Sequence, residues 1–182
     1  MKRIHRWSAS VAFVAVIALG SPSISEQASP ALADDNGDLG HKIAGTYLAV
    51  QGDGAQVLQI SQDGNLRVVF SIQFTSGGAL GTSFSDTLGS WKKTGKQEVT
   101  ARTTDLVFQS GNGFFGVAGA TYVIKFDKEF QTATVTCEGA IFAPGVNPFD
   151  ANAEPIAGSG FTCGPGSEFH RIPLDGENDN HE

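Results

Sequence analysis

The sequence has few of the residues that most catalytic and metal sites require. It contains four histidines, and only His170 lies in a segment that reads as a strand. Neither a G-x-S-x-G nor an H-E-x-x-H motif occurs, so a serine-hydrolase triad and a zinc-protease site have no support. We therefore expect no metal and no cofactor, and the residues identify no catalytic group.

Basic side chains are also scarce. The chain has 12 Lys and Arg against 19 Asp and Glu, and residues 1–33 hold three of the basic residues and one of the acids. Without that segment, 9 basic and 18 acidic residues leave a net charge of -9. Such a surface repels phosphate backbones, so we expect no nucleic-acid partner.

No apolar run is long enough to cross a membrane as a helix, which takes about 20 residues. The longest, Val11–Leu19, follows three basic residues and precedes Ala31–Ala33, the pattern of a signal peptide with a small-residue cleavage site. We predict a signal peptide over 1–33, a secreted or periplasmic protein, and no membrane span after cleavage. An uncleaved membrane anchor is the alternative.

Cysteine occurs only twice, as Cys137 and Cys163. Two cysteines in an exported chain normally pair, because the compartment is oxidising. The alternatives are two free thiols, or half of a metal site, which would need two further ligands. We predict a disulfide between them.

Apolar residues instead recur with a period of two, which is typical of half-buried antiparallel strands. No segment shows the helical spacing over several turns. The clearest apolar row is formed by Leu66, Val68, Phe70, Ile72 and Phe74.

Turn sequences divide the chain into seven or eight such strands, and Asp63-Gly64 is the strongest hairpin signal. Sequential hairpins of this number usually close and so remove their edges. We predict an all-β fold, an antiparallel up-and-down β-barrel of about eight strands, with a β-sandwich as the alternative. The barrel is expected over 43–174, between a flexible segment 34–42 and a disordered acidic tail 175–182.

Several short motifs follow one another in a suggestive order: Gly45-Thr46-Tyr47, the Asp63-Gly64 hairpin, Gly89-Ser90-Trp91 and a strand that ends at Phe108. Over residues 43–142 the chain resembles small secreted bacterial barrels of the lipocalin-like (calycin) type, and more distantly allene-oxide-cyclase and dirigent barrels. True lipocalins carry G-x-W on the first strand, whereas here that strand has Tyr47. The resemblance implies a cup-shaped barrel that holds a small ligand, and it carries over no catalytic residue.

Five residues are candidates for ligand binding. Phe70, Phe74 and Phe108 are aromatic side chains that could line an apolar pocket. Arg102 and Glu138 stand on polar rows of two strands and would form a buried charged cluster if those rows faced inward. The alternative is that these rows are the solvated outer face.

One acidic residue, Asp105, stands on the opposite and mostly apolar row of its strand, and is the other candidate for an inward polar group. These residues suggest that the barrel binds a small apolar or amphipathic molecule without catalysis. A cyclase or isomerase that uses Arg102 and Glu138 is a second possibility. A filled structural or adhesive surface barrel is the third.

The disulfide can be tested by alkylation. Denatured, unreduced protein is expected to take up no iodoacetamide, whereas reduced protein takes up two labels. Mass spectrometry distinguishes the two results, and two labels before reduction would contradict the pairing.

Overall fold

The computed structural model describes residues 33–52, 54–109 and 111–173. The predicted signal peptide, apart from its last residue, and the predicted acidic tail lie outside these ranges. The elements, in chain order, are α1 (Ala33–Ile43), β1 (Gly45–Gln51), β2 (Gly54–Ile60), β3 (Asn65–Phe70), the short 3₁₀ turn η1 (Ala79–Gly81), β4 (Ser83–Phe84), β5 (Thr87–Gly95), β6 (Glu98–Gln109), β7 (Gly113–Phe126), β8 (Thr132–Phe142) and β9 (Phe161–Arg171).

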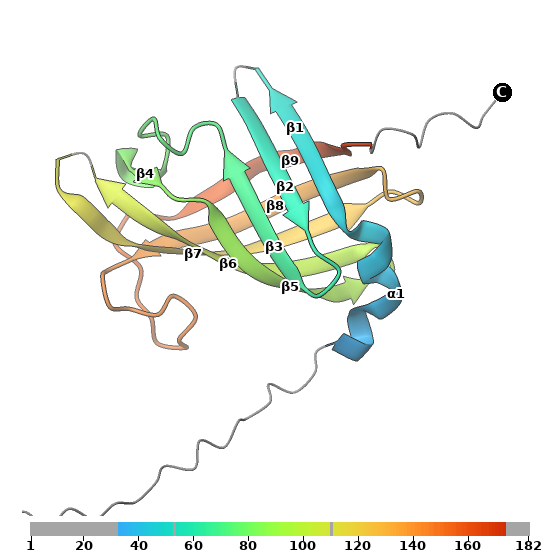
Figure 1. Cartoon of the computed structure of the whole chain (residues 1–182). Helices are drawn as coiled ribbons and strands as arrows, with labels where there is room; N and C mark the ends of the chain where they lie inside the picture. The colour runs from blue at the N-terminus through green and yellow to red at the C-terminus, as the bar shows by residue number, and fades with distance from the viewer. Residues whose placement is uncertain (1–32, 53, 110, 174–182) are drawn as a thin grey trace, which may run out of the picture. The chain divides into compact units, whose positions relative to one another are not determined.

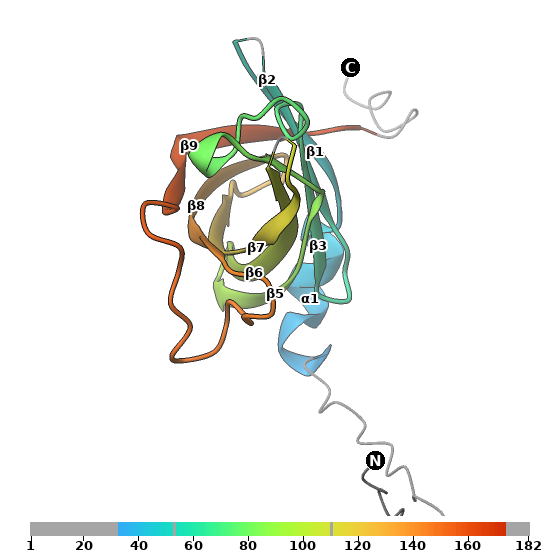
Figure 2. The same cartoon turned by 90° about the vertical axis from the view of Figure 1, so that its left-hand side faces the viewer.

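Eight strands close into an antiparallel barrel (Figures 1 and 2). Going round the ring, β1, β2, β3, β5, β6, β7, β8 and β9 each pair with the next, and β9 pairs back with β1. The short β4 pairs with the last part of β6, beyond the stretch that pairs with β5. The predicted all-β fold and up-and-down barrel are confirmed, and the alternative β-sandwich does not form.

The period of two in the sequence becomes the inside and the outside of this ring. On β3, Leu66 and Val68 are buried, whereas Arg67 between them is exposed. Matching inward rows from the other strands join them in one apolar core. Closure stabilises the ring because each of the eight strands has a hydrogen-bonded neighbour on both sides.

The strand predicted around Phe70 ends earlier than its alternating pattern does. The side chain of Gln73 accepts a hydrogen bond from the Phe70 backbone N–H (3.1 Å) and donates one to Asp86 (3.0 Å). This buried glutamine turns the chain away from the sheet. Ile72 and Phe74 are therefore exposed, and their predicted place in the strand is wrong.

The segment 34–42, predicted to be flexible, is instead part of the helix α1. Leu39 and Ile43 lie four residues apart, on one face of the helix, and both are buried in the barrel core. The Arg171 guanidinium donates hydrogen bonds to two carbonyl groups at the C-terminal end of α1 and lies 5.9 Å from the centroid of the Tyr47 ring. α1 thus covers one end of the barrel, and these contacts stabilise it as a helix.

The long connection between β8 and β9, residues 143–160, is irregular, as its prolines predict. The buried Ser159 hydroxyl donates to the carbonyl of Ile141 and accepts from its N–H, which ties the connection back to β8. Cys137 and Cys163 face each other on β8 and β9 and form a disulfide, with their Cα atoms 4.9 Å apart. The predicted pairing is confirmed.

Replacing both cysteines by serine should destabilise the barrel. The disulfide closes a loop of 26 residues, and the loss of loop-closure entropy from the unfolded chain is worth about 3.5 kcal/mol. We expect Cys137→Ser/Cys163→Ser to lower the free energy of unfolding by about that amount in urea titrations. Reduced wild-type protein should behave like the double variant, and unchanged stability in both would contradict the structural role of the disulfide.

Candidate functional site

A cavity of about 280 Å³ lies inside the barrel, at the end opposite α1. Strands β1, β3, β6 and β8 end here, and β2, β5, β7 and β9 begin here. The β3–β5 connection also contributes to its wall, through residues that include Ala79 and Thr82. Gln51, Ile72 and Thr162 in the wall are exposed, so the cavity reaches the surface.

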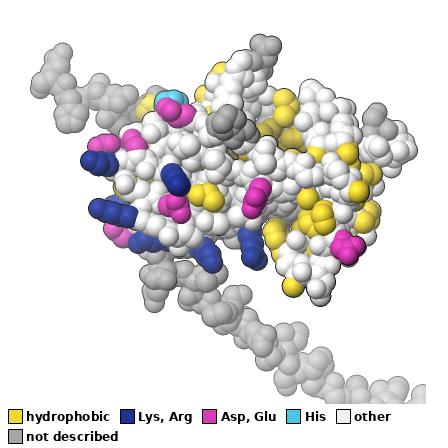
Figure 3. All heavy atoms as spheres, turned by 180° about the vertical axis from the view of Figure 1, so that it is seen from behind, with side chains coloured by type: hydrophobic (Ala, Val, Ile, Leu, Met, Phe, Trp, Pro, Cys, Tyr) yellow, Lys and Arg dark blue, Asp and Glu magenta, His cyan; other side chains and the backbone are white. Residues whose placement is uncertain are grey.

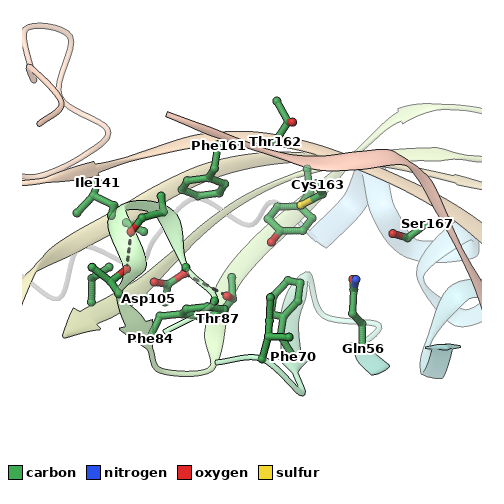
Figure 4. Close-up of a pocket in the computed structure, with 18 of the residues that line it drawn as sticks. Gln56, Phe70, Phe84, Thr87, Asp105, Ile141, Phe161, Thr162, Cys163 and Ser167 are labelled. Carbon is green, nitrogen blue, oxygen red and sulfur yellow. Dashed lines mark hydrogen bonds between the residues drawn. The ribbon is translucent and has the colours of Figure 1, made fainter. Parts of the chain in front are cut away.

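The wall of the cavity is mostly apolar. Phe70 and Phe84 pack edge to face, with ring centroids 5.7 Å apart, and Figure 4 shows Phe161 across the cavity from them. Val107 and Ile141 add aliphatic surface. A site of this kind favours a ligand with an apolar body.

Asp105 is a carboxylic acid inside this apolar wall. The inward position of Asp105 follows from the pairing of β6 with β7. This pairing runs without a shift from Glu98 to Val107, so alternate residues of β6 face the same side of the barrel wall. The row that includes Val99 and Ala101 is buried in the core, and Asp105 belongs to the same row, with its side chain partly buried.

The Asp105 carboxyl has one hydrogen bond and one unpartnered oxygen. The Thr87 hydroxyl donates to Oδ2 at 3.2 Å, as Figure 4 shows, whereas the buried Oδ1 makes no hydrogen bond. Burial raises the pKa of Asp105 to about 7, and the Thr87 hydrogen bond opposes part of that shift. The acid can therefore change its protonation state near neutral pH, and its free oxygen costs energy until something binds to it.

Tyr122 on β7 is the second polar group of the inner wall. It is 3% exposed. Burial raises the pKa of its phenol strongly, the charge of Asp105 adds to the rise, and the Thr87 hydroxyl opposes it. Tyr122 stays a neutral phenol that lines the same cavity as Asp105.

No lysine, arginine or histidine is among the described residues that line the cavity. Cys163 contributes there as half of the disulfide and does not titrate. Asp105 and Tyr122 are therefore the titratable groups of the described wall, and neither has a positively charged partner in it.

The structure brings one of the five sequence-predicted site residues, Phe70, into the cavity wall. Phe74 is 80% exposed on the β3–β5 connection. Phe108 follows the register shift of β6, is partly exposed and packs against Phe114 with ring centroids 6.2 Å apart. Neither of these two phenylalanines lines the cavity.

The two charged candidates lie on the outer face of the barrel. Arg102 is exposed, with its guanidinium 5.7 Å from the centroid of the Phe149 ring in the β8–β9 connection. Glu138 on β8 is exposed as well. The physical reason is that their rows alternate with the buried apolar rows, so closure turns them outward, and no inward charged cluster forms from them.

Sequence reasoning did not single out Thr87 and Tyr122. A signal existed for Tyr122, because it stands in the same alternating row as Ala118, Ala120 and Ile124. Thr87 has no such signal, since it is the first residue of β5 and only the ring brings it beside Asp105.

Exposed apolar side chains gather around the cavity end of the barrel. Phe108 and Phe114 flank the β6–β7 turn, and Leu80 projects from the β3–β5 connection. On the face seen in Figure 3, hydrophobic side chains group toward one end, and most charged side chains lie toward the other. An apolar molecule therefore meets apolar surface near the entrance.

Within the described ranges, no group of three or more His, Cys, Asp or Glu side chains could hold a metal ion. No described helix has the length and apolar character needed to cross a membrane. Comparisons with protein-family models, with curated proteins and with solved structures find no match for this chain.

The partly buried acid should make stability depend on pH. Between pH 3.8 and pH 7 the folded protein keeps a proton on Asp105 that the unfolded chain releases. The free energy of unfolding contributed by this proton is fully present below pH 3.8 and is lost as pH rises to 7, a total of about 4 kcal/mol. Asp105→Asn lacks this titration, so its stability relative to wild type should rise by about 4 kcal/mol between pH 4 and pH 8.

Urea denaturation of both proteins at intervals across this range measures the difference. Curves that stay parallel from pH 4 to pH 8 would show that the acid is not buried as described.

Proposed function

We propose that the protein is an exported carrier that binds a small apolar or amphipathic molecule in the cavity of its barrel. The observation that carries the proposal is an apolar cavity of about 280 Å³ that contains a buried carboxyl with an unpartnered oxygen. The apolar wall would hold the body of the ligand, and Asp105 would bind its polar end.

The distribution of side-chain sizes supports a binding role. Barrels of eight strands have an interior just wide enough for side chains to fill it or to hold one small ligand. Here the half next to α1 is filled by large side chains such as Trp91, Tyr47 and Phe169. At the other end Ala118 and Ser167 leave space that larger residues would occupy.

Contact with such an apolar wall favours binding. Each 100 Å² of apolar surface that leaves water contributes about 2.5 kcal/mol. A hydrogen bond to the free Asp105 oxygen adds orientation, because a buried acceptor without a partner disfavours ligands that cannot satisfy it.

A second candidate function is acid–base catalysis of an isomerisation or cyclisation. It is favoured by one observation, the pKa of about 7 for Asp105 in an apolar cavity, since general acids and bases work best near the ambient pH. In that case Asp105 would transfer the proton, rather than the exposed Arg102 and Glu138.

The closed antiparallel barrel with a cavity at one end supports kinship with the lipocalin-like barrels that the sequence resembles. The first strand carries Tyr47 where true lipocalins have tryptophan, and its ring is buried against Arg171. The disulfide supports a location outside the cytoplasm, in keeping with the predicted signal peptide, because disulfides persist in oxidising compartments.

Binding can be tested with N-phenyl-1-naphthylamine, a neutral apolar fluorophore that emits strongly in apolar surroundings. Wild-type protein should bind it saturably, and Phe70→Arg should weaken binding at least tenfold, because a charge would enter the cavity wall. The matched control is Phe74→Arg, which places the same charge on an exposed position only four residues away and should leave binding unchanged.

A second variant covers the possibility that Phe70→Arg fails to fold. Ala118→Phe fills the cavity without adding charge and should also abolish binding, with folding checked by circular dichroism. Fluorescence that does not saturate, or that persists in a folded Ala118→Phe variant, would overturn the proposal.

A further inference from the structure

The cavity contains an acidic group, the carboxyl of Asp105, that has no positively charged partner among the described wall residues. Asp105 faces Thr87 from β5 and Ala118 and Tyr122 from β7. Ile141 from β8 and Phe161 from β9 line the cavity with it. Among these neighbours only Tyr122 titrates, and it does so as an acid, so no described wall residue supplies a cation.

The charged residue next to Thr87 in the chain, Asp86, is already paired. Asp86 precedes Thr87, and its carboxylate accepts hydrogen bonds from Arg67 and from Gln73. These bonds lower the pKa of Asp86, with the Gln73 contact the larger cause. Arg67 thus neutralises Asp86 at the barrel surface, and Asp105 is left with the hydroxyl of Thr87.

We propose that the cavity selects organic amines, whose ammonium group pairs with the carboxylate of Asp105 while their apolar body lies between the phenylalanine rings. This inference rests on the proposed binding function and adds the chemical class of the ligand. The free Oδ1 of Asp105 accepts an N–H of the ammonium, which satisfies the buried oxygen and supplies the missing counter-charge.

Two further features favour a cation over a neutral or anionic ligand. The faces of aromatic rings attract cations, and Phe70, Phe84 and Phe161 line the cavity together with Tyr122. The chain carries a formal charge of -7, and a negative field raises the local concentration of cations and repels carboxylates.

Amine binding also has a defined proton balance. In the free protein Asp105 binds a proton up to about pH 7. The ammonium stabilises the ionised carboxylate, so the acid proton leaves to solvent when the amine binds below that pH. Binding at pH 6 therefore releases about one proton per ligand, whereas a neutral ligand that accepts a hydrogen bond from the protonated acid releases none.

The test compares three ligands with the same apolar body: 4-phenylbutylamine, 4-phenylbutanol and 4-phenylbutyrate. Isothermal titration calorimetry at pH 8 should give an affinity for the amine at least tenfold above that for the alcohol, and no binding of the carboxylate. Asp105→Asn should reduce the amine to the affinity of the alcohol. The matched control Glu138→Gln makes the same acid-to-amide change on the outer face and should leave the preference intact.

The proton balance is measured by repeating the amine titration at pH 6 in buffers of different ionisation enthalpy. About one proton should be released with wild-type protein and none with Asp105→Asn.

The possible results distinguish the amine selectivity from the proposed carrier function. If N-phenyl-1-naphthylamine binds but the amine binds no more tightly than the alcohol, or Asp105→Asn keeps the preference for the amine, the amine selectivity is wrong and the carrier function stands. If neither the fluorophore nor any of the three ligands binds, both proposals fail.

Discussion

The antiparallel register between β6 and β7, which runs without a shift from Glu98 to Val107, is the constraint on which the candidate site depends. Twelve residue pairs join these strands, and the one shift comes after Val107. Because side chains alternate strictly along a regular strand, an extra residue in β6 between Ala101 and Asp105 would turn that acid outward. The regular alternation thus places the carboxyl of Asp105 in the interior, although water at the surface would solvate this group better.

The barrel divides its interior between stability and binding. At one end α1, Arg171 and large aromatic side chains fill the ring and hold its strands together. At the other end smaller side chains and the β3–β5 connection enclose space. The disulfide lies at the border, since Cys137 packs in the core and Cys163 lines the cavity. The stability that the filled half contributes can therefore offset the packing energy that the hollow half lacks.

Asp105 shows the cost of such a site. A buried acid with one hydrogen bond destabilises the folded protein once it ionises, and a residue such as leucine would avoid that loss. Thr103, one step deeper in the same row, also has a buried hydroxyl without a partner. A polar group left unsatisfied in a core lowers stability, and service to a ligand or a reaction is one reason for a protein to keep it.

The sequence by itself determined the local features of this protein: the strands from their period of two, the hairpin at Asp63-Gly64, and the disulfide from the presence of exactly two cysteines in a chain with a predicted signal peptide. It could not decide which side of a strand faces inward, because the rows of Arg102 and Asp105 alternate equally well. Closure of the barrel decided which row faces inward, and it buried the row of Asp105, whose other members are more apolar. Tertiary contact also made α1 a helix, and it brought Thr87 beside Asp105 from a separate strand, which no local pattern encodes.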